Sequence, residues 1–386
     1  MVHTSDWHLG RAFHGVAMLE AQAAFLDGLV ELVRGERVQA VLVSGDVYDR
    51  ALPAPDTVAL LSDAVTRLVD AGAVVVLSAG NHDSAIRLGF AASLLSRAGL
   101  HIRCAPERIG VPVLLDGVAV YPLPYLEPTL TAPTLGARSS THAGVLRAAM
   151  QRVTRDRQGR GGASVVMAHA FVAEAVPSES ERDIAVGGVS VVPAAVFDGV
   201  DYVALGHLHR PQQRSERLCY SGSPLAWSFG EAGQVKGSWL VDVRPGEVDT
   251  QFVPAPVPRP LAVLRGELED LLADPRHTDA ERAWCQVVLT DPIRPLGAME
   301  RVSTRFPHTL SLRFEPRGPA TGPSHYAARR VVEKSELAVC AEFLAHVRAG
   351  AGPDEAEQAL LREAVEGSRV ARGEHDDEGV PGRVVA

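Results

Sequence analysis

Five short motifs rich in oxygen and imidazole side chains follow one another along the first 211 residues, and none contains a cysteine. They are Asp6-Trp7-His8, Gly45-Asp46, Gly80-Asn81-His82-Asp83, His169 and Gly206-His207-Leu208-His209. Carboxylate, amide carbonyl and neutral imidazole suit borderline to hard divalent ions such as Mn2+, Fe2+ or Zn2+, whereas structural zinc cages usually include thiolates. Two such ions about 3.5 to 4 Å apart can clamp the attacking and leaving oxygens of a displacement at phosphorus. The donor set therefore predicts a two-metal phosphoesterase site, in which Asp46 is the candidate bridging carboxylate.

Each motif follows a short apolar run that is typical of a buried β-strand. These runs span residues 2–4, 41–43, 74–77, 165–167 and 202–205. In α/β sheets, sites are built at the carboxyl ends of the strands, so motifs far apart in sequence should converge. Gly45, Gly80 and Gly206 should let the backbone turn sharply and approach the ions closely.

A single motif of this kind has ordinary explanations. An Asp or His at a strand end often caps the next helix or faces water, and Gly-Asn is a common turn. Five motifs in order, each at a strand end, favour a metal site.

The elements between the motifs predict an α/β core. Apolar residues recur at helical spacing over residues 17–34 and 56–71, and further strands are expected at 218–221, 238–243 and 250–253. The alternating prolines Pro254, Pro256, Pro258 and Pro260 indicate an extended linker. Beyond it, the stretches 262–264, 284–290, 297–305 and 309–314, with a polar helix-compatible stretch near 279–282, predict a small α+β module.

The full motif order resembles the calcineurin-like metallophosphoesterases, whose pattern D-x-H, GD, GNH(D/E), H, GHxH is matched without a gap. Within that superfamily, four segments resemble the SbcD family, the nuclease subunits of bacterial SbcCD complexes: residues 3–11, 45–50 with Pro53, 206–212 and 220–224. The resemblance covers about residues 1–255 by specific motifs. It implies a two-sheet sandwich flanked by helices, with a small α+β capping domain and C-terminal helices.

The resemblance also implies a role for each motif residue. One ion would be held by Asp6, His8, Asp46 and His209, and the other by Asp46, Asn81, His169 and His207. His82 would be the catalytic histidine, which stabilises the transition state or protonates the leaving oxygen and is not a ligand.

The stretch after Asp46 departs from the archaeal and eukaryotic relatives, because no second histidine follows. It reads Asp46-Val47-Tyr48-Asp49-Arg50, a GD-x-x-D-R pattern shared with phosphomonoesterases of the superfamily. Asp49 is expected to partner His82 and Arg50 to contact phosphate, with a surface ion pair as the alternative for both. Arg11 is a further candidate for a DNA phosphate contact, or else a solvated surface charge.

Composition agrees with an intracellular enzyme of two or three domains. The 386 residues are 46% hydrophobic, and no apolar run reaches the roughly 20 residues that a membrane span needs. The first strand begins at once, so no signal peptide is expected. The four scattered cysteines, Cys104, Cys219, Cys285 and Cys340, predict reduced, mostly buried thiols and a cytoplasmic location, at the nucleoid when DNA is bound.

The net charge of −9 argues against nucleic acid, but bound metal ions and arginines near the motif loops would attract phosphates. Many of the acids lie between residues 354 and 378, away from the motifs. Net charge therefore decides nothing about DNA.

The predicted domains are 1–255, the nuclease domain; 256–322, the capping domain; 323–370, a helical partner-binding segment; and 371–386, a disordered tail. Two apolar helical stripes lie in the third segment: Leu337, Cys340, Phe343, Leu344 and Val347, then, after Pro353, Leu360, Leu361, Ala364 and Val365. These helices either pack on their own domain or, as the resemblance implies, dock onto the coiled-coil base of an SbcC-type ABC ATPase. The chain has no Walker A pattern, so any ATPase must be another polypeptide.

The leading functional prediction is a Mn2+-dependent DNA endo/exonuclease subunit. It would act with the ATPase in DNA break repair, recombination and replication, on hairpin or blocked ends, as a homodimer within a heterotetramer. A phosphomonoesterase or small-molecule phosphodiesterase is the alternative, slightly favoured by Asp49-Arg50. A non-enzymatic scaffold is the least supported, since such proteins lose ligands and none is missing here.

Overall fold

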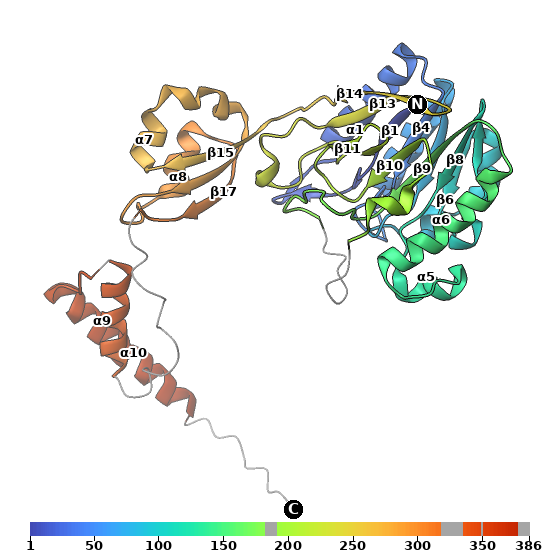
Figure 1. Ribbon diagram of the computed structural model, residues 1–386. Helices are drawn as coiled ribbons and strands as arrows, with labels where there is room; N and C mark the ends of the chain where they lie inside the picture. Colours follow the sequence, from blue (N-terminus) through green and yellow to red (C-terminus); the bar gives the residue numbers. More distant parts are fainter. Residues whose placement is uncertain (182–190, 318–334, 349, 377–386) are drawn as a thin grey trace, which may run out of the picture. The chain divides into compact units, whose positions relative to one another are not determined.

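The computed structural model describes residues 1–181, 191–317, 335–348 and 350–376. Its N-terminal part is built on two six-stranded sheets (Figure 1). The strands of the first sheet lie in the order β14 (Glu247–Pro254), β13 (Gly237–Arg244), β1 (Val2–Thr4), β4 (Ala40–Ser44), β5 (Val74–Ser78) and β6 (Leu100–Arg103). Strands β1, β4, β5 and β6 run parallel, and β13 and β14 complete the sheet in antiparallel pairing.

The second sheet has a parallel centre with antiparallel edges. Its order is β11 (Gln212–Ser215), β12 (Leu218–Tyr220), β10 (Tyr202–Gly206), β9 (Ala163–His169), β8 (Val118–Pro122) and β7 (Val113–Leu115). Strands β12, β10, β9 and β8 are parallel, so the carboxyl ends of β9 and β10 lie at one edge.

Helices cover the outer face of each sheet. On the first sheet, α1 (Leu19–Gly35) buries Phe25, Leu29 and Val33 at helical spacing, and α2 (Pro55–Asp70) begins with a proline, which is preorganised for a first turn. On the second sheet the covering helices are α5 (Pro128–Leu135) and α6 (His142–Gln158). The ends of α1 and α2 differ by one or two residues from those predicted.

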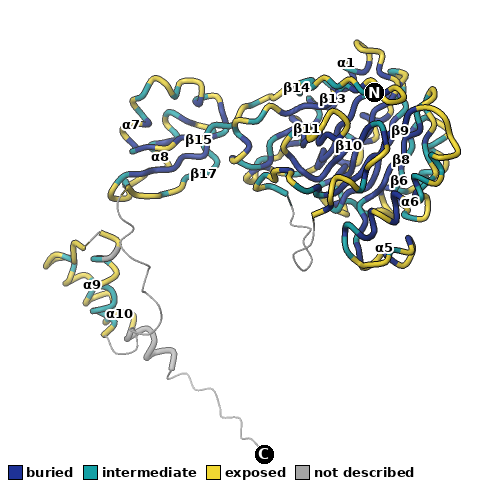
Figure 2. Tube along the Cα trace, viewed as in Figure 1, coloured by how far each residue is buried: buried dark blue, intermediate teal, exposed yellow. Residues whose placement is uncertain are grey.

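The alternation of strand residues explains the layers. Val41 and Val43 of β4 pack with α1 and α2, whereas Leu42 faces a third cluster that includes Val165 and Met167 of β9. The resulting helix–sheet–sheet–helix layering confirms the predicted two-sheet sandwich. Figure 2 shows the central strands β9 and β10 buried along their length.

Short elements follow and connect the main strands. They are β2 (Ala12–Phe13), β3 (Val16–Ala17), α3 (Ala85–Leu88), α4 (Ala92–Leu95), and the 3-10 turns η1 (Ser96–Ala98), η2 (Pro106–Arg108), η3 (Ala194–Phe197) and η4 (Phe229–Glu231). All four cysteines are free, and Cys104, Cys219 and Cys285 are buried, as predicted.

A third, three-stranded sheet has the order β15 (Leu261–Gly266), β16 (Trp284–Leu289) and β17 (Thr309–Phe314). Helices α7 (Leu268–Ala273) and α8 (Ala298–Arg305) belong to the same α+β module. The helical stretch expected near 279–282 is the end of a 3-10 segment, η5 (Pro275–Arg282).

The chain contacts divide into two compact units. The first comprises Met1–Val263, Thr278–Gln286 and His308–Ser311, and the second comprises Leu264–His277, Val287–Pro307 and Leu312–Ala386.

Two C-terminal helices, α9 (Glu336–Val347) and α10 (Glu355–Asp376), pack on each other. Arg348 and Glu357 form a bidentate ion pair at 2.7 Å next to the turn that joins the helices. The expectation of a disordered tail from residue 371 is wrong for residues 371–376, which continue α10. Residues 377–386 and the predicted boundary at 322–323 lie outside the described residues.

Within the described part of the chain, no helix combines the length and the apolar character needed to cross a bilayer.

Candidate metal centre

The loops that carry the five motifs leave the carboxyl ends of β1, β4, β5, β9 and β10. His169 is the last residue of β9, and the other motif side chains follow their strands by one to five residues. The seven acidic and histidine side chains gathered there are almost completely buried: Asp6, His8, Asp46, His82, His169, His207 and His209. Burying so many ionisable groups is costly unless they are paired or bind a metal.

Asp46 lies in the middle of the group. Its Oδ2 is 3.4 Å from His169 Nε2, 3.6 Å from His8 Nε2 and 3.9 Å from His82 Nε2. Its Oδ1 accepts a hydrogen bond of 2.9 Å from the backbone N–H of His82. One carboxylate therefore faces imidazoles from three different loops.

The remaining side chains fall on two sides of Asp46. On one side, Asp6, His8 and His209 offer ligand atoms within 4.8 Å of one another, and Nε2 of His8 lies 3.0 Å from Nε2 of His209. On the other side, Nε2 of His169 lies 2.8 Å from the amide oxygen of Asn81.

The ring of His207 lies beside that of His169, with 5.3 Å between the ring centroids. The structure thus brings all seven predicted ligands to one place, and Asp6 also offers a ligand atom within 4.8 Å of those of Asp46 and His169, across the division that the resemblance implies.

Protonation in the metal-free centre is set by burial and mutual charge. Burial and the charge of His169 lower the pKa of His207 to about 3, and burial lowers the pKa of His209 well below its usual range. Burial raises the pKa of Asp6 to about 6, with Asp46 adding to the effect. Burial opposes protonation of His169, but Asp46 and Asp6 outweigh it and raise its pKa to about 9. For Asp46, burial is outweighed by the imidazoles, His169 foremost, and its pKa lies well below normal.

The backbone at the centre is strained. Asp6, His8, Asp46 and His207 have φ angles of 52°, 43°, 49° and 101°, in the left-handed region that non-glycine residues rarely adopt. Such strain costs roughly 1 to 3 kcal/mol per residue and tends to persist where a site requires the geometry.

Two glycines permit the close approach of the loops. A Cβ on Gly45, whose φ is 85°, would lie 2.3 Å from His169 Nδ1. A Cβ on Gly80 would lie 2.1 Å from Asp46 Oδ1. Any side chain at either position would displace a candidate ligand.

His82 is held by Asp49, although not through the group expected. Its Nδ1 donates a 2.8 Å hydrogen bond to the main-chain carbonyl of Asp49. The Asp49 carboxylate lies 3.9 Å from the same nitrogen and 3.5 Å from Nδ1 of His8. The carboxylate therefore lies between the two imidazoles, while the backbone orients the ring of His82.

The two candidate phosphate contacts differ sharply in environment. Arg11 is 19% exposed, lies over the ring of Trp227 at 5.2 Å and donates through Nη2 to the carbonyl of Ser180 at 3.0 Å. Its Nη1 is buried and, among the described residues, has no hydrogen-bond partner. Arg50 is 80% exposed and lies 3.7 Å from the carboxylate of Asp49.

A buried network that the sequence did not indicate surrounds His209. The hydroxyl of Ser180 lies 2.6 Å from His209 Nδ1 and donates to Glu231 at 2.6 Å. Because that hydroxyl has a single proton, it accepts from Nδ1–H, which leaves the lone pair of Nε2 directed at His8. The backbone N–H of His209 donates to Glu181 at 2.7 Å, and its carbonyl accepts from buried Lys236 at 2.8 Å. Lys236 also forms a short ion pair with Glu231.

Asp83, the last residue of the third motif, bridges two loops of the centre. Its carboxylate accepts from the backbone N–H groups of Val47 at 3.1 Å, Tyr48 at 2.9 Å and Gly80 at 2.9 Å. It thereby ties the loop after β5 to the loop after β4. No sequence signal distinguishes Ser180, Glu231 or Lys236, but the strand-end position of Asp83 could have suggested this role.

Two family models match this chain. The calcineurin-like phosphoesterase model matches residues 1–211, and the SbcD_C model, the Type 5 capsule protein repressor C-terminal domain, matches residues 257–348. The combination agrees with the SbcD resemblance of the motifs. Since the first match spans more than half of the chain and contains the whole buried Asp/His centre, the chain belongs to the calcineurin-like phosphoesterases, which hydrolyse phosphoester bonds.

Proposed function

We propose that this phosphoesterase is a two-metal DNA endo/exonuclease subunit that acts with an SbcC-type ABC ATPase. The observation that carries the proposal is the joint presence, in one chain, of the buried Asp/His centre and a C-terminal SbcD_C match. The associated roles are DNA break repair, recombination and replication, with processing of hairpin or blocked ends in the cytoplasm at the nucleoid.

The donor chemistry fits two divalent ions, which we propose are Mn2+. The Nε2 atoms of His8 and His209 lie 3.0 Å apart, and Ser180 fixes the lone pair of the His209 atom toward this gap. A cation in this gap would bind both imidazole nitrogens, in place of the hydrogen bond that His8 Nε2–H can donate to that lone pair. The proposed ligands are Asp6, His8, Asp46 and His209 for one ion and Asp46, Asn81, His169 and His207 for the other. When bound, the ions would polarise the phosphoester and lower the pKa of water.

His82 is the proposed catalytic acid. Because its Nδ1 is engaged by the Asp49 carbonyl, its Nε2 faces the centre, 3.9 Å from Asp46 Oδ2. From there it would hold a proton for the leaving oxygen or stabilise charge on the phosphoryl group.

Arg11 is the stronger of the two proposed phosphate contacts. Its Nη1 is buried and has no hydrogen-bond partner within the described ranges, and a phosphate oxygen at the centre would satisfy it. Arg50 would contribute an outer, solvent-screened contact, because its side chain is mostly exposed.

The parts beyond the phosphoesterase domain (1–255) are proposed to select DNA and a partner. Residues 256–322 would form a capping domain, and residues 323–370 would bind the ATPase. The apolar side chains of Phe343, Val347 and Leu360 are 55%, 58% and 65% exposed, as expected for residues that bind an apolar surface of a partner. Truncation after Pro323 should abolish co-purification with the ATPase and spare nuclease activity; retained association would contradict this assignment. Homodimerisation within a heterotetramer completes the proposal.

One comparison tests the proposed activity. Hairpin DNA, linear DNA, p-nitrophenyl phosphate and bis-p-nitrophenyl phosphate are offered side by side with Mn2+ to the wild type and to His82→Ala. DNA and the diester should be cleaved by the wild type and hardly at all by the variant. The second candidate function, a phosphomonoesterase or small-molecule phosphodiesterase, is favoured by the Asp49-Arg50 pair. Preference for the monoester would establish it instead.

A further inference from the structure

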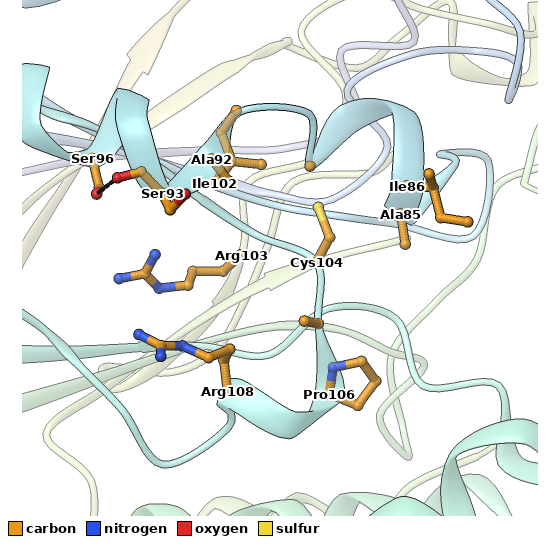
Figure 3. Close-up of a pocket in the computed structure, with 12 residues that line it drawn as sticks. Ala85, Ile86, Ala92, Ser93, Ser96, Ile102, Arg103, Cys104, Pro106 and Arg108 are labelled. Carbon is orange, nitrogen blue, oxygen red and sulfur yellow. Dashed lines mark hydrogen bonds between the residues drawn. The ribbon is translucent and has the colours of Figure 1, made fainter.

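A pocket of about 590 Å³ is lined by residues of α3, α4, β6 and η2 and has no role in the proposed function. Figure 3 shows the pocket walls, which include Ile86, Ser93, Cys104 and the side chains of Arg103 and Arg108. The two guanidinium groups lie one beside the other and project to the same side of the pocket (Figure 3). Two like charges therefore share one cavity.

The position of Arg103 on its strand keeps part of its side chain out of water. Residues of β6 alternate between buried and half-buried, so Leu100 and Ile102 pack in the core while His101 and Arg103 lie on the opposite face. The Nε of Arg103 is buried and has no hydrogen-bond partner among the described residues. Burial, and secondarily the charge of Arg108, lower the pKa of Arg103.

No acid compensates these charges in the part of the chain that the structure describes. Neither Arg103 nor Arg108 takes part in an ion pair there, and the nearest acid in sequence, Glu107, is exposed. A half-buried guanidinium beside a second cation is unfavourable unless an anion joins them. The planar fork of arginine matches phosphate oxygens particularly well.

The fold places this pocket next to the reacting loops. Strand β6 pairs in parallel with β5, and Arg103 is the register partner of Ser78. Neighbouring strands lie about 4.8 Å apart, so Arg103 ends its strand at the same sheet edge from which Asn81 and His82 emerge. The pocket wall begins at Ala85, three residues after His82. A nucleic acid strand with one linkage in the centre would extend past this edge.

We propose that Arg103 and Arg108 together form a phosphate subsite, which holds a backbone phosphodiester of the DNA substrate outside the scissile linkage. The subsite rests on the proposed DNA nuclease function and adds to it a residue pair that positions the strand. Its recognition is independent of base sequence, because both contacts go to phosphate.

The test compares Arg103→Gln/Arg108→Gln with a control of equal charge change, Arg34→Ala/Arg244→Ala. Arg34 and Arg244 are exposed, and each forms an ion pair with a nearby carboxylate, Glu31 and Asp242 respectively. Binding of fluorescent DNA is measured by anisotropy in EDTA over a series of salt concentrations, and hydrolysis of bis-p-nitrophenyl phosphate with Mn2+ is measured in parallel.

The subsite variant should bind DNA about tenfold more weakly than the control, and the slope of log K against log salt should fall by about one, as expected for one lost phosphate contact. Hydrolysis of the small diester should be unchanged, since it is too short to reach the pocket. Equal DNA affinity and slope in the two variants would overturn the subsite while leaving the nuclease function standing.

Two further outcomes separate the sources of phosphate. If titration calorimetry shows inorganic phosphate binding to the wild type and not to the subsite variant, with DNA affinity unaffected, the pocket takes free phosphate and the DNA assignment is overturned. If the wild type hydrolyses the small diester but neither binds nor cleaves DNA, the proposed function itself fails, and the DNA subsite with it.

Discussion

Replacing Glu231 with Gln should destabilise the protein far more than a typical single substitution. Glu231 and Lys236 are 1% and 2% exposed, and they form an ion pair below the carbonyl of His209. Removing one partner of a buried pair leaves an uncompensated charge and costs about 3 to 5 kcal/mol. The effect should therefore exceed what the loss of one hydrogen bond would produce.

The remaining contacts of Lys236 place the expected cost at the lower end. Its ammonium keeps three neutral acceptors, at 2.8 Å from His209 O, 3.1 Å from Gln234 Oε1 and 3.3 Å from Ser223 Oγ. We therefore expect a loss of about 3 kcal/mol in the free energy of unfolding. For a unit of this size the corresponding fall in Tm is about 6 to 12 °C.

Urea unfolding of the metal-free protein, followed by tryptophan fluorescence, measures this loss. All four tryptophans, Trp7, Trp227, Trp239 and Trp284, belong to the first compact unit, so the signal reports on the unit that contains the pair. The double variant Glu231→Gln/Lys236→Met should recover most of the stability, because no unpaired charge remains. A loss below about 1 kcal/mol in the single variant, or no recovery in the double variant, would refute this reasoning.

Three other predictions concern the metal centre. Ser180→Ala removes the acceptor of His209 Nδ1–H and should weaken Mn2+ binding about tenfold or more in a chelator competition. The control is Ser178→Ala, which should leave Mn2+ affinity unchanged because the Ser178 hydroxyl has no hydrogen-bond partner in the described structure. Equal Mn2+ affinities of the two variants would contradict the network. In the metal-free protein, the carboxylates of Asp46 and Asp6 outweigh the effect of burial and raise the pKa of His169 to about 9. Below that pH, Mn2+ must displace a proton from His169 in order to bind. The affinity of the protein for Mn2+ should therefore rise as the pH rises. Calorimetry in two buffers of different ionisation enthalpy detects this proton, and its absence at neutral pH would disprove the assignment. Asp49→Asn should lower turnover less than about tenfold and leave the metal content nearly unchanged, because the main-chain carbonyl that orients the imidazole of His82 is retained. A loss of turnover above a thousandfold would instead place the Asp49 carboxylate at the chemical step.

The strand-end motifs were predictable because they depend on local pattern. An apolar run followed by a polar ligand residue specifies both a buried strand and the loop at its carboxyl end. Every such strand is present within one residue of its expected bounds, apart from β9, which runs two residues longer at each end. The helix ends were equally close, since Pro55 and the apolar spacing of α1 are local signals. His169 differs slightly, because it completes β9 instead of following it.

The support around the ligands was not predictable, because its members are distant in sequence and common in type. Ser180 meets Glu231, 51 residues away, only after the loop beyond β9 folds over the end of β10. The role of Asp49 was expected for its carboxylate, yet the hydrogen bond to His82 comes from its carbonyl, which is independent of side-chain identity.

For this protein, amino-acid pattern alone determined which side chains can bind metal and that each lies at a strand end, because residue type and short-range periodicity are properties of the chain. The tertiary structure decided which of them face one another, which arginine is buried beside the centre, and that Arg103 shares a pocket with Arg108. Those relations arise from sheet order and register, which bring together residues that no local interaction connects.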